Sequence, residues 1–190
     1  MTVVDADGDE VGGTTPEFAG DVTEAILSGD VKPGTYSRTA VRRSVLPAAG
    51  YPDERFPSWQ DQEWHIRLSQ HCKYASVPDR LAVRRYSDRE QITDDFESKR
   101  DVSYPLLIRK HGSLAASYGP ECRRKFVGRL TRTLGFSALR NGHYGEALRY
   151  LLEAVARNPA DRHTYVVLLS ALGGPVTYRP ARRISRWLSG

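Results

Sequence analysis

Hydrophobic positions recur every three to four residues along the second half of the chain, which predicts helices there. A first helix is expected over 96–110, with an interruption at Pro105, where proline removes a backbone donor. Pro120 is expected to open a second helix, because proline suits the first helical turn. Its apolar positions are Cys122, Phe126, Leu130, Leu134 and Ala138. Two further helices are predicted over 146–157, ending at Asn158-Pro159, and over 162–172.

The first half of the chain predicts short strands mixed with short helices. Val3-Val4 and Val11 flank an acidic turn over 5–10, which is typical of a hairpin. A short amphipathic helix is expected over 20–29. The β-formers of Thr35–Val41 predict a strand, and 42–46 begins a short helix that runs into Gly50. A strand pair or one long strand is predicted over 73–86. The fold class is therefore α/β, followed by an all-α C-terminal extension.

Asp5 and Asp7 in the acidic turn raise the alternative of a metal site. A calcium loop would continue to a glutamate far downstream after an obligatory glycine, and Glu17 and Gly20 do not fit that spacing. A surface turn is the favoured interpretation, and no metal ligand is assigned in this chain.

Residues Gly50–Leu68 carry the densest set of chemically active side chains. The stretch holds two acidic pairs, Asp53-Glu54 and Asp61 with Glu63, and aromatic residues lie around and between them in the sequence. Asp61 is expected at the N-cap of a helix, where a carboxylate accepts backbone N–H bonds. A carboxylate fixed at a helix start and walled by aromatics suits a general base. The alternative stays open that Asp61 is a cap alone and that the tryptophans are core.

Composition limits the classes of protein that the chain can belong to. Its 190 residues carry a net charge of +5 and 39% hydrophobic residues. This allows one domain, or one small domain with an appendage. No apolar run is long enough to span a membrane, and no secretion signal is visible. Cys72 and Cys122 are expected to be reduced thiols. A cytoplasmic protein is predicted.

Charge is distributed unevenly along the chain. Residues 1–30 hold eight acidic residues and no Lys or Arg, whereas residues 121–190 hold thirteen basic and four acidic residues. No zinc-finger or ribonucleoprotein signature accompanies the basic part, so a solvated helical face is favoured and no nucleic-acid partner is expected. The basic tail over 179–190 has two open interpretations. It is a peripheral contact with an anionic inner membrane face, or a frayed terminus.

One stretch of the helical half has the spacing of a single tetratricopeptide unit, over about 131–164. The matching positions are Leu134, Gly135, Ala147, Leu151, Ala154 and Pro159. The aromatic positions of the first helix are replaced by Thr131 and Ala138. One such unit has to stack on something. Packing on the preceding domain is expected, and a peptide-binding groove is the alternative.

The stretch Gly50–Leu68 resembles the acceptor-side segment of inverting family 2 glycosyltransferases. In that family a G-F-D-E-x-F turn precedes an acidic pair, which opens a helix reading roughly D-W-x-L-W-x-R-L. Gly50, Tyr51, Asp53, Glu54 and Phe56 fit the turn, with Pro52 as a departure. Gln60 and Asp61 occupy the acidic pair, where Gln60 departs from the usual Glu. Trp64, Ile66, Arg67 and Leu68 fit the helix.

The resemblance implies roles for these residues. Asp61 would deprotonate the acceptor hydroxyl. Acceptor contacts would come from Trp59, Gln60, Arg67, Asp53 and Glu54. The arginines near the family's next conserved segment, Arg84, Arg85 and Arg89, would approach the donor diphosphate. The Q-x-x-R-W signature of processive members is lacking, so a polysaccharide synthase is not expected.

The resemblance covers about residues 1–95, the acceptor half of a glycosyltransferase A-type fold. The helical extension would then occupy 96–178 and the basic tail 179–190. The half that binds the nucleotide sugar, with its Asp-x-Asp and a divalent cation (Mn²⁺ or Mg²⁺), is expected before Met1. The chain alone is therefore expected to be a weak or inactive transferase. Its partners would be a nucleotide sugar and a glycan or lipid-linked acceptor. The alternative function is a non-catalytic helical module that binds a partner.

Overall fold

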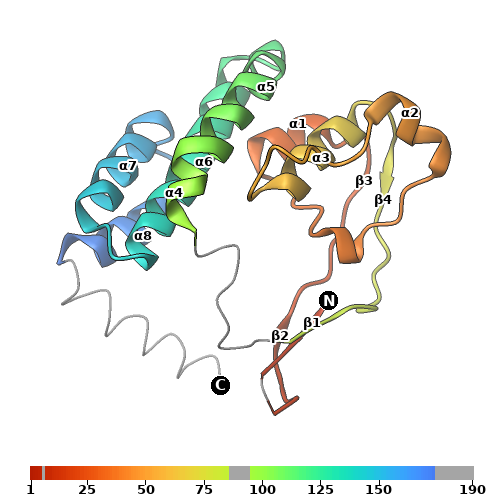
Figure 1. The fold of residues 1–190 in the computed structure, drawn as a ribbon, viewed down its shortest axis with the longest axis horizontal. Coiled ribbons are helices and arrows are strands. Elements are labelled where there is room, and N and C mark those ends of the chain that lie inside the picture. Colours follow the sequence, from red (N-terminus) through yellow and green to blue (C-terminus); the bar gives the residue numbers. More distant parts are fainter. Residues whose placement is uncertain (6, 86–94, 174–190) are drawn as a thin grey trace. The chain divides into compact units, whose positions relative to one another are not determined.

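The protein is mixed α/β, with small sheets in its N-terminal part and a mostly helical C-terminal part (Figure 1). The structure is a computed structural model that describes residues 1–5, 7–85 and 95–173. The described chain divides into two compact units. The sheet unit comprises Met1–Arg55 and Trp59–Arg85, and the helical unit comprises Phe56–Ser58 and residues 95–173.

The predicted N-terminal hairpin is confirmed. β1 (Thr2–Val4) pairs antiparallel with β2 (Glu10–Gly13). In the connecting turn, Asp5 Oδ1 accepts hydrogen bonds from the amides of Asp7 and Gly8 at 3.0 and 2.9 Å. The Asp5 carboxylate thus stabilises the turn, as expected of an acidic residue that mimics a backbone turn.

The strands form two small sheets. β1 pairs in parallel with β5 (Val83–Arg85), giving the order β2-β1-β5. β3 (Ala19–Gly20) pairs antiparallel with β4 (Tyr74–Ala75). The prediction that 73–86 forms one strand or one strand pair is wrong over its described residues, because β4 and β5 lie in different sheets. Each of them pairs with a strand from the start of the chain instead.

The strand predicted over Thr35–Val41 is also absent. The segment contains a short 3-10 helix, η1 (Tyr36–Arg38), between the extended residues Thr35 and Thr39. β-Propensity alone does not make a strand, because the backbone N–H and C=O groups need a partner beside them. No described strand pairs with this segment.

The short helices of the sheet unit fall close to their predicted places. α1 (Thr23–Ser28) ends at Gly29, whose φ of 90° is left-handed. A 3-10 helix, η2 (Arg43–Val45), continues directly into α2 (Leu46–Ala49). The central helix is α3 (Gln60–Ser69).

α3 forms the core of the sheet unit. Its Trp64 and Leu68 pack with Ala49 of α2 in one buried cluster. On another side, Ile66 is fully buried, and Ser69 O accepts a hydrogen bond from Thr23 Oγ1 of α1 at 2.9 Å. Because α3 contacts both α1 and α2, its side chains are held in fixed positions.

The helical unit begins with one continuous helical run. It consists of α4 (Phe96–Ser98), a π-helical turn, η4 (Lys99–Ser103), and α5 (Tyr104–Ser117). The predicted interruption at Pro105 is confirmed, because the widened turn lies directly before this proline. Asp95 caps the run by accepting a hydrogen bond from Ser98 N at 2.9 Å.

Three antiparallel helices follow, and all three predictions are confirmed. α6 (Pro120–Arg140), α7 (Tyr144–Arg157) and α8 (Arg162–Leu172) pack in sequence, with α5 on α6 (Figure 1). α6 and α7 approach closely at Gly135, where an added Cβ would lie 2.9 Å from Leu151 Cγ. Among the described residues, no helix is long and apolar enough to cross a membrane.

Candidate functional site

The turn before α3 has an unusual backbone. Trp59, the N-cap residue of α3, has φ 63° and ψ 15° and makes no side-chain cap bond. It is the only described residue other than glycine with positive φ. A bulky residue in the left-handed region is strained, and such strain is found most often at functional sites. The strain therefore marks this turn as a candidate site.

Asp61 lies inside the first turn of α3 and does not cap it, so the predicted N-cap role is wrong. Trp59 occupies the cap because α3 begins at Gln60, two residues earlier than a cap at Asp61 would require. Asp61 Oδ1 accepts a hydrogen bond from Gln62 N at 2.7 Å. The side chain is half-buried, and burial raises the pKa of the Asp61 carboxyl, against the lowering effect of nearby backbone N–H groups. A carboxylate that binds protons more tightly is a better base.

Tyr36 of η1 belongs to the surroundings of Asp61. Burial is the largest cause that raises the pKa of the Tyr36 phenol to about 12, and the charges of Asp61 and Glu63 act in the same direction. The ring makes an edge contact with Trp64, with centroids 5.5 Å apart. The Tyr36 hydroxyl is buried and makes no hydrogen bond within the described residues. The Tyr36 hydroxyl is therefore a neutral group enclosed by the protein, without a hydrogen-bond partner among the described residues.

Sequence reasoning missed Tyr36 as a site residue, because it assigned this segment to a regular strand. The only available signal was an aromatic hydroxyl between two further hydroxyl residues, Thr35 and Ser37.

Arg67 connects α3 to the loop after α2. Its Nε and Nη2 bind the two carboxylate oxygens of Glu63, each at 2.8 Å. It also donates to the carbonyls of Ala49 and Tyr51. The carbonyl between these two, that of Gly50, accepts from Trp64 Nε1 at 2.8 Å. Three successive carbonyls, that of Ala49 at the end of α2 and those of Gly50 and Tyr51 in the loop, are thus fixed to α3.

This arrangement requires glycine at position 50. Gly50 has φ 74°, and an added Cβ would lie 2.9 Å from Arg67 Nη1. Arg67 uses four of the five guanidinium N–H groups in the bonds just described. The geometry therefore favours a positioning role for Arg67, and the acceptor contact expected from the sequence stays a prediction.

The acidic pair Asp53-Glu54 lies in the loop that Arg67 holds. Asp53 forms a two-point ion pair with Arg55, with Oδ1–Nε 2.9 Å and Oδ2–Nη2 2.7 Å. Glu54 is exposed. Of the two, Glu54 is the one whose carboxylate faces solvent.

One face of α3 continues from Asp61 into a cavity. Asp61, His65 and Leu68 follow each other at spacings of four and three, so they share one side of the helix, and Cys72 lies three residues after its end. His65, Leu68 and Cys72 line a cavity of about 720 Å³ in the sheet unit. Asp61 does not line this cavity and lies one helical turn away from His65.

His65 is held neutral in the cavity wall. Its Nδ1 lies 2.8 Å from the hydroxyl of Tyr74, and its Nε2 lies 3.3 Å from Thr39 Oγ1. The pKa of His65 is lowered to about 4, mainly by burial; a hydrogen bond with the backbone of Gly34 acts against this, and the charge of Arg38 acts with it. This histidine therefore stabilises the wall, and proton transfer near neutral pH is not its role.

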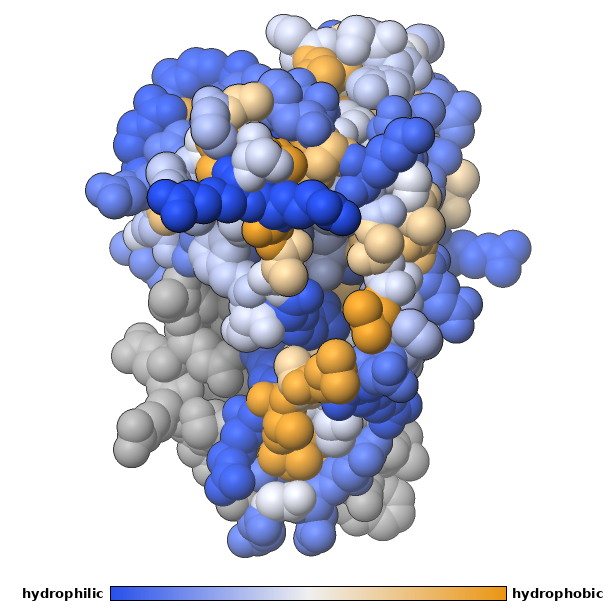
Figure 2. Space-filling model, turned by 90° about the vertical axis from the view of Figure 1, so that its right-hand side faces the viewer, coloured by the Kyte–Doolittle hydropathy of each residue, from blue (hydrophilic) through white to orange (hydrophobic). Residues whose placement is uncertain are grey.

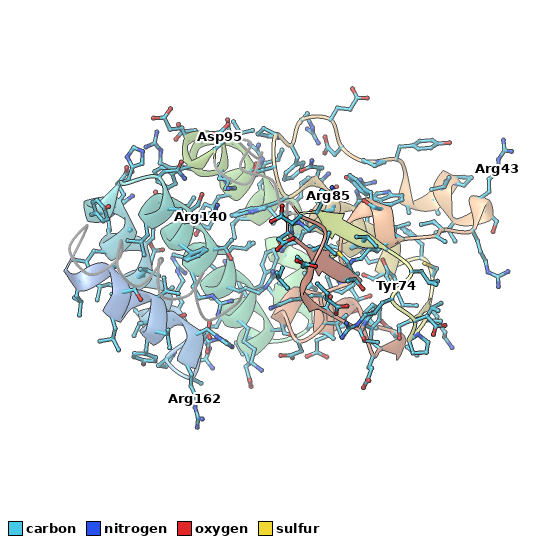
Figure 3. All side chains as sticks on the ribbon, turned by 90° about the horizontal axis from the view of Figure 1, so that it is seen from below. Arg43, Tyr74, Arg85, Asp95, Arg140 and Arg162 are labelled. Atoms are coloured by element: carbon cyan, nitrogen blue, oxygen red, sulfur yellow. The ribbon has the colours of Figure 1, made fainter. Side chains whose placement is uncertain are left out.

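The structure describes two of the three candidate donor-binding arginines. Arg84 and Arg85 are successive residues of β5, and both are exposed (Arg85 is labelled in Figure 3). Successive strand residues point to opposite faces, so the two side chains do not converge on one phosphate. Arg89 lies outside the described residues.

The described residues contain no group of three or more His, Cys, Asp or Glu side chains that could hold a metal ion. Comparison with protein-family models, with curated proteins and with solved structures gives no match for this chain. The geometry above and the sequence resemblance are therefore the basis for a functional proposal.

Proposed function

We propose that the sheet unit is the acceptor side of an inverting, family 2-like glycosyltransferase. In this reaction the acceptor hydroxyl oxygen attacks the anomeric carbon of a nucleotide-activated sugar. The bond from that carbon to the diphosphate breaks, and the nucleoside diphosphate leaves with the bonding electrons. The acceptor proton goes to the carboxylate of Asp61.

The observation that carries this proposal is the environment of Asp61. The carboxylate sits on a helix anchored on two sides, and burial raises its pKa. Fixed geometry and a raised pKa are the two requirements of a general base. The strained backbone of Trp59 adjoins it, as expected where structure is held for function.

Neighbouring groups would orient the acceptor. Gln60 precedes Asp61 at the helix start, and its amide can donate to or accept from a sugar hydroxyl. The indole of Trp59 is half-buried and offers a stacking surface for a sugar ring. Glu54 supplies an exposed carboxylate. Arg67 acts through the loop that it holds.

A divalent cation is expected for the complete enzyme and would bind the diphosphate. The described residues offer no cluster of ligands for it, so no step in this chain is assigned to the metal. Its ligands are expected on a nucleotide-binding half supplied by another polypeptide segment.

The proposal is tested by substituting Asp61 in a reconstituted enzyme. The chain is joined to the polypeptide encoded immediately upstream and assayed with a panel of nucleotide sugars and acceptors. We expect Asp61→Asn to lower kcat/KM by about 10²- to 10⁴-fold, with little change in unfolding. Asp7→Asn in the exposed hairpin turn is the matched control and should leave the rate unchanged. Equal rates for wild type and Asp61→Asn would reject the general base.

A second candidate function is a non-catalytic module that binds a partner through the helical unit. The supporting observation is the exposed apolar surface of α8, where Val166, Leu169 and Leu172 are 64%, 67% and 62% exposed. Substituting Leu169 with Glu would disrupt such binding and leave transfer unchanged. Reversing the charges of Arg182, Arg183 and Arg186, which lie outside the described residues, would test the tail in the same way.

A further inference from the structure

The cavity of about 720 Å³ in the sheet unit is not used by the proposed function, since Asp61 does not line it. Its volume lies within the range of about 300–1,000 Å³ that is common for small-molecule sites. Part of its floor is the buried side chain of Leu68. Val41, Val45 and Tyr74 also line the cavity and pack against the cluster to which Leu68 belongs. The apolar floor is therefore one side of the packed core, which fixes its shape.

Basic side chains outnumber acidic ones in the lining of this cavity. The basic residues are Arg38, Arg42 and Lys73, and Asp79 is the only acidic residue that lines it among the described residues. Arg42, Lys73 and Asp79 are exposed, whereas Arg38 is half-buried. Water solvates the exposed charges, so Arg38 is the lining residue whose charge most needs a partner from inside the cavity.

Contacts from several segments hold the guanidinium of Arg38 in place. Its Nη1 donates a hydrogen bond to Thr14 Oγ1 at 3.0 Å. Its Nη2 lies so close to Gly34 that a Cβ added at position 34 would overlap it. On the side of α3, its charge acts on His65 and helps to lower the pKa of that histidine. The positive charge is therefore fixed at the cavity wall, next to His65.

The charge of Arg38 has no opposite charge to balance it within the part of the chain that the structure describes. No described carboxylate forms an ion pair with it, and its Nε is buried without a hydrogen-bond partner there. His65 cannot supply a charge, because it is neutral near pH 7. A partly buried charge without compensation is unfavourable. An anion in the cavity would therefore offset a cost that the protein alone carries.

Apolar side chains at the rim of the cavity are open to solvent. Val77 and Leu81 line it and are 56% and 81% exposed. Figure 2 shows hydrophobic side chains gathered on the face that it draws, with strongly hydrophilic ones around them. Exposed apolar residues grouped in this way commonly mark a binding surface. A ligand with an apolar body would cover the rim and the floor together.

We propose that this cavity binds a small monocarboxylate, with its apolar body on the floor formed by Leu68 and Tyr74 and its carboxylate paired with Arg38. A single negative charge matches the single half-buried cation. The second charge of a phosphate monoester would depend on the exposed Arg42 and Lys73, and exposed ion pairs contribute little. The inference goes beyond the proposed function and does not depend on it.

The test uses the full chain and three probes, measured by isothermal titration calorimetry at neutral pH. Octanoate has both the apolar body and the carboxylate, 1-octanol has the body without the charge, and acetate has the charge without the body. We expect octanoate to bind 1:1 and about tenfold or more tightly than 1-octanol, because a charge-assisted hydrogen bond is added. Acetate should show no saturable binding. Octanoate should shift the amide NMR signals of residues 37–42 and 72–77.

A pair of variants tests the role of Arg38. Arg38→Met keeps an unbranched side chain and removes the charge, so it should weaken octanoate binding by about tenfold and leave 1-octanol binding unchanged. Arg43→Met is the matched control, because Arg43 is an exposed arginine of η2 that does not line the cavity (labelled in Figure 3). It should bind both probes as the wild type does. Should Arg38→Met fail to fold, the comparison of octanoate with 1-octanol on the wild type still decides.

Several results would overturn the inference. These are no saturable binding of octanoate, equal affinities for octanoate and 1-octanol, an equal loss in Arg38→Met and Arg43→Met, or NMR shifts confined to the helical unit. Asp61→Asn should bind octanoate as the wild type does, because Asp61 does not line the cavity. Loss of sugar transfer and loss of carboxylate binding are thus measured separately, and either proposal can fail without the other.

Discussion

Arg67 lies one helical turn after Glu63 on α3, and its guanidinium closes on both oxygens of that fully buried carboxylate. A buried ion pair is a weak contributor to net stability, but removing one partner leaves a charge without compensation. Here the same guanidinium also holds the loop that carries Gly50 and Asp53. The pair therefore couples the stability of the sheet unit to the shape of the candidate site.

Substituting Arg67 with Ala should destabilise the sheet unit by about 3–5 kcal/mol. The expected loss reflects the buried charge of Glu63 and the freed carbonyls of the loop. It is measured by urea unfolding followed through the fluorescence of Trp59 and Trp64. Arg157→Ala is the matched control, because Arg157 pairs with Glu153 at the same spacing but on an exposed surface. The loss of unfolding free energy in Arg157→Ala, measured by circular dichroism, should stay below about 1 kcal/mol.

Removing the hydroxyl of Tyr36 should not weaken the fold. The hydroxyl is buried without a hydrogen-bond partner, so Tyr36→Phe is expected to be neutral or to stabilise by up to about 1 kcal/mol. Tyr74→Phe is the comparison, because the Tyr74 hydroxyl bonds His65, and it should cost about 1 kcal/mol or more. A stability loss in Tyr36→Phe as large as in Tyr74→Phe would contradict the finding that the Tyr36 hydroxyl has no hydrogen-bond partner among the described residues.

The stability of the sheet unit should fall as the pH is lowered from about 6.5 to about 4, through His65. Its pKa is about 4 in the folded chain and 6.5 in the unfolded chain, so the unfolded state binds the proton first. The contribution of neutral His65 to the free energy of unfolding is therefore fully present above pH 6.5 and is lost as the pH falls towards 4. The loss amounts to roughly 3 kcal/mol.

A variant with glutamine at His65 isolates this effect. The difference in unfolding free energy between wild type and His65→Gln should shrink as the pH falls across that window. His71→Gln, at an exposed histidine just after α3, should show no such change. Parallel pH profiles for wild type and His65→Gln would show that the histidine is not held neutral.

Two glycines in helices should respond in opposite directions to alanine. At Gly135 the new Cβ would lie 2.9 Å from Leu151 Cγ, so Gly135→Ala should destabilise the helical unit by about 1–3 kcal/mol. At Gly112 in α5 the closest side-chain atom would lie at 3.8 Å. Gly112→Ala should therefore stabilise by about 0.5–1 kcal/mol, because alanine is the better helix former. Thermal unfolding followed by circular dichroism measures both changes.

The helical unit could be predicted closely from the sequence. Proline at position 120 and the apolar spacing from Phe126 to Leu134 describe a helix that depends mainly on local periodicity. The π-helical turn before Pro105 also follows from a local cause. Such features are encoded within a few residues of where they occur.

Residues 35–41 show what local reasoning cannot supply. Their β-propensity is real, yet a strand depends on a neighbour that may be distant in sequence. The same limit applies to β4 and β5, which pair with strands from the start of the chain. The candidate site shows the same division. The sequence placed Asp61 near the start of a helix, although not at the correct position, whereas the contact of Tyr36 with Trp64 depends on the tertiary structure that brings η1 to α3.

The parallel pairing of Thr2 with Val83 also has a kinetic consequence. Nearly the whole sheet unit must leave the ribosome before β1 can meet β5, whereas each helix of the helical unit contacts a sequence neighbour. Non-local pairing is slow because a long loop must close first. The sheet unit is therefore expected to be the slow-folding part of the chain. During that delay the β1–β2 hairpin has one open edge, on the side of β1 that later pairs with β5, and this edge is the part most exposed to misassembly.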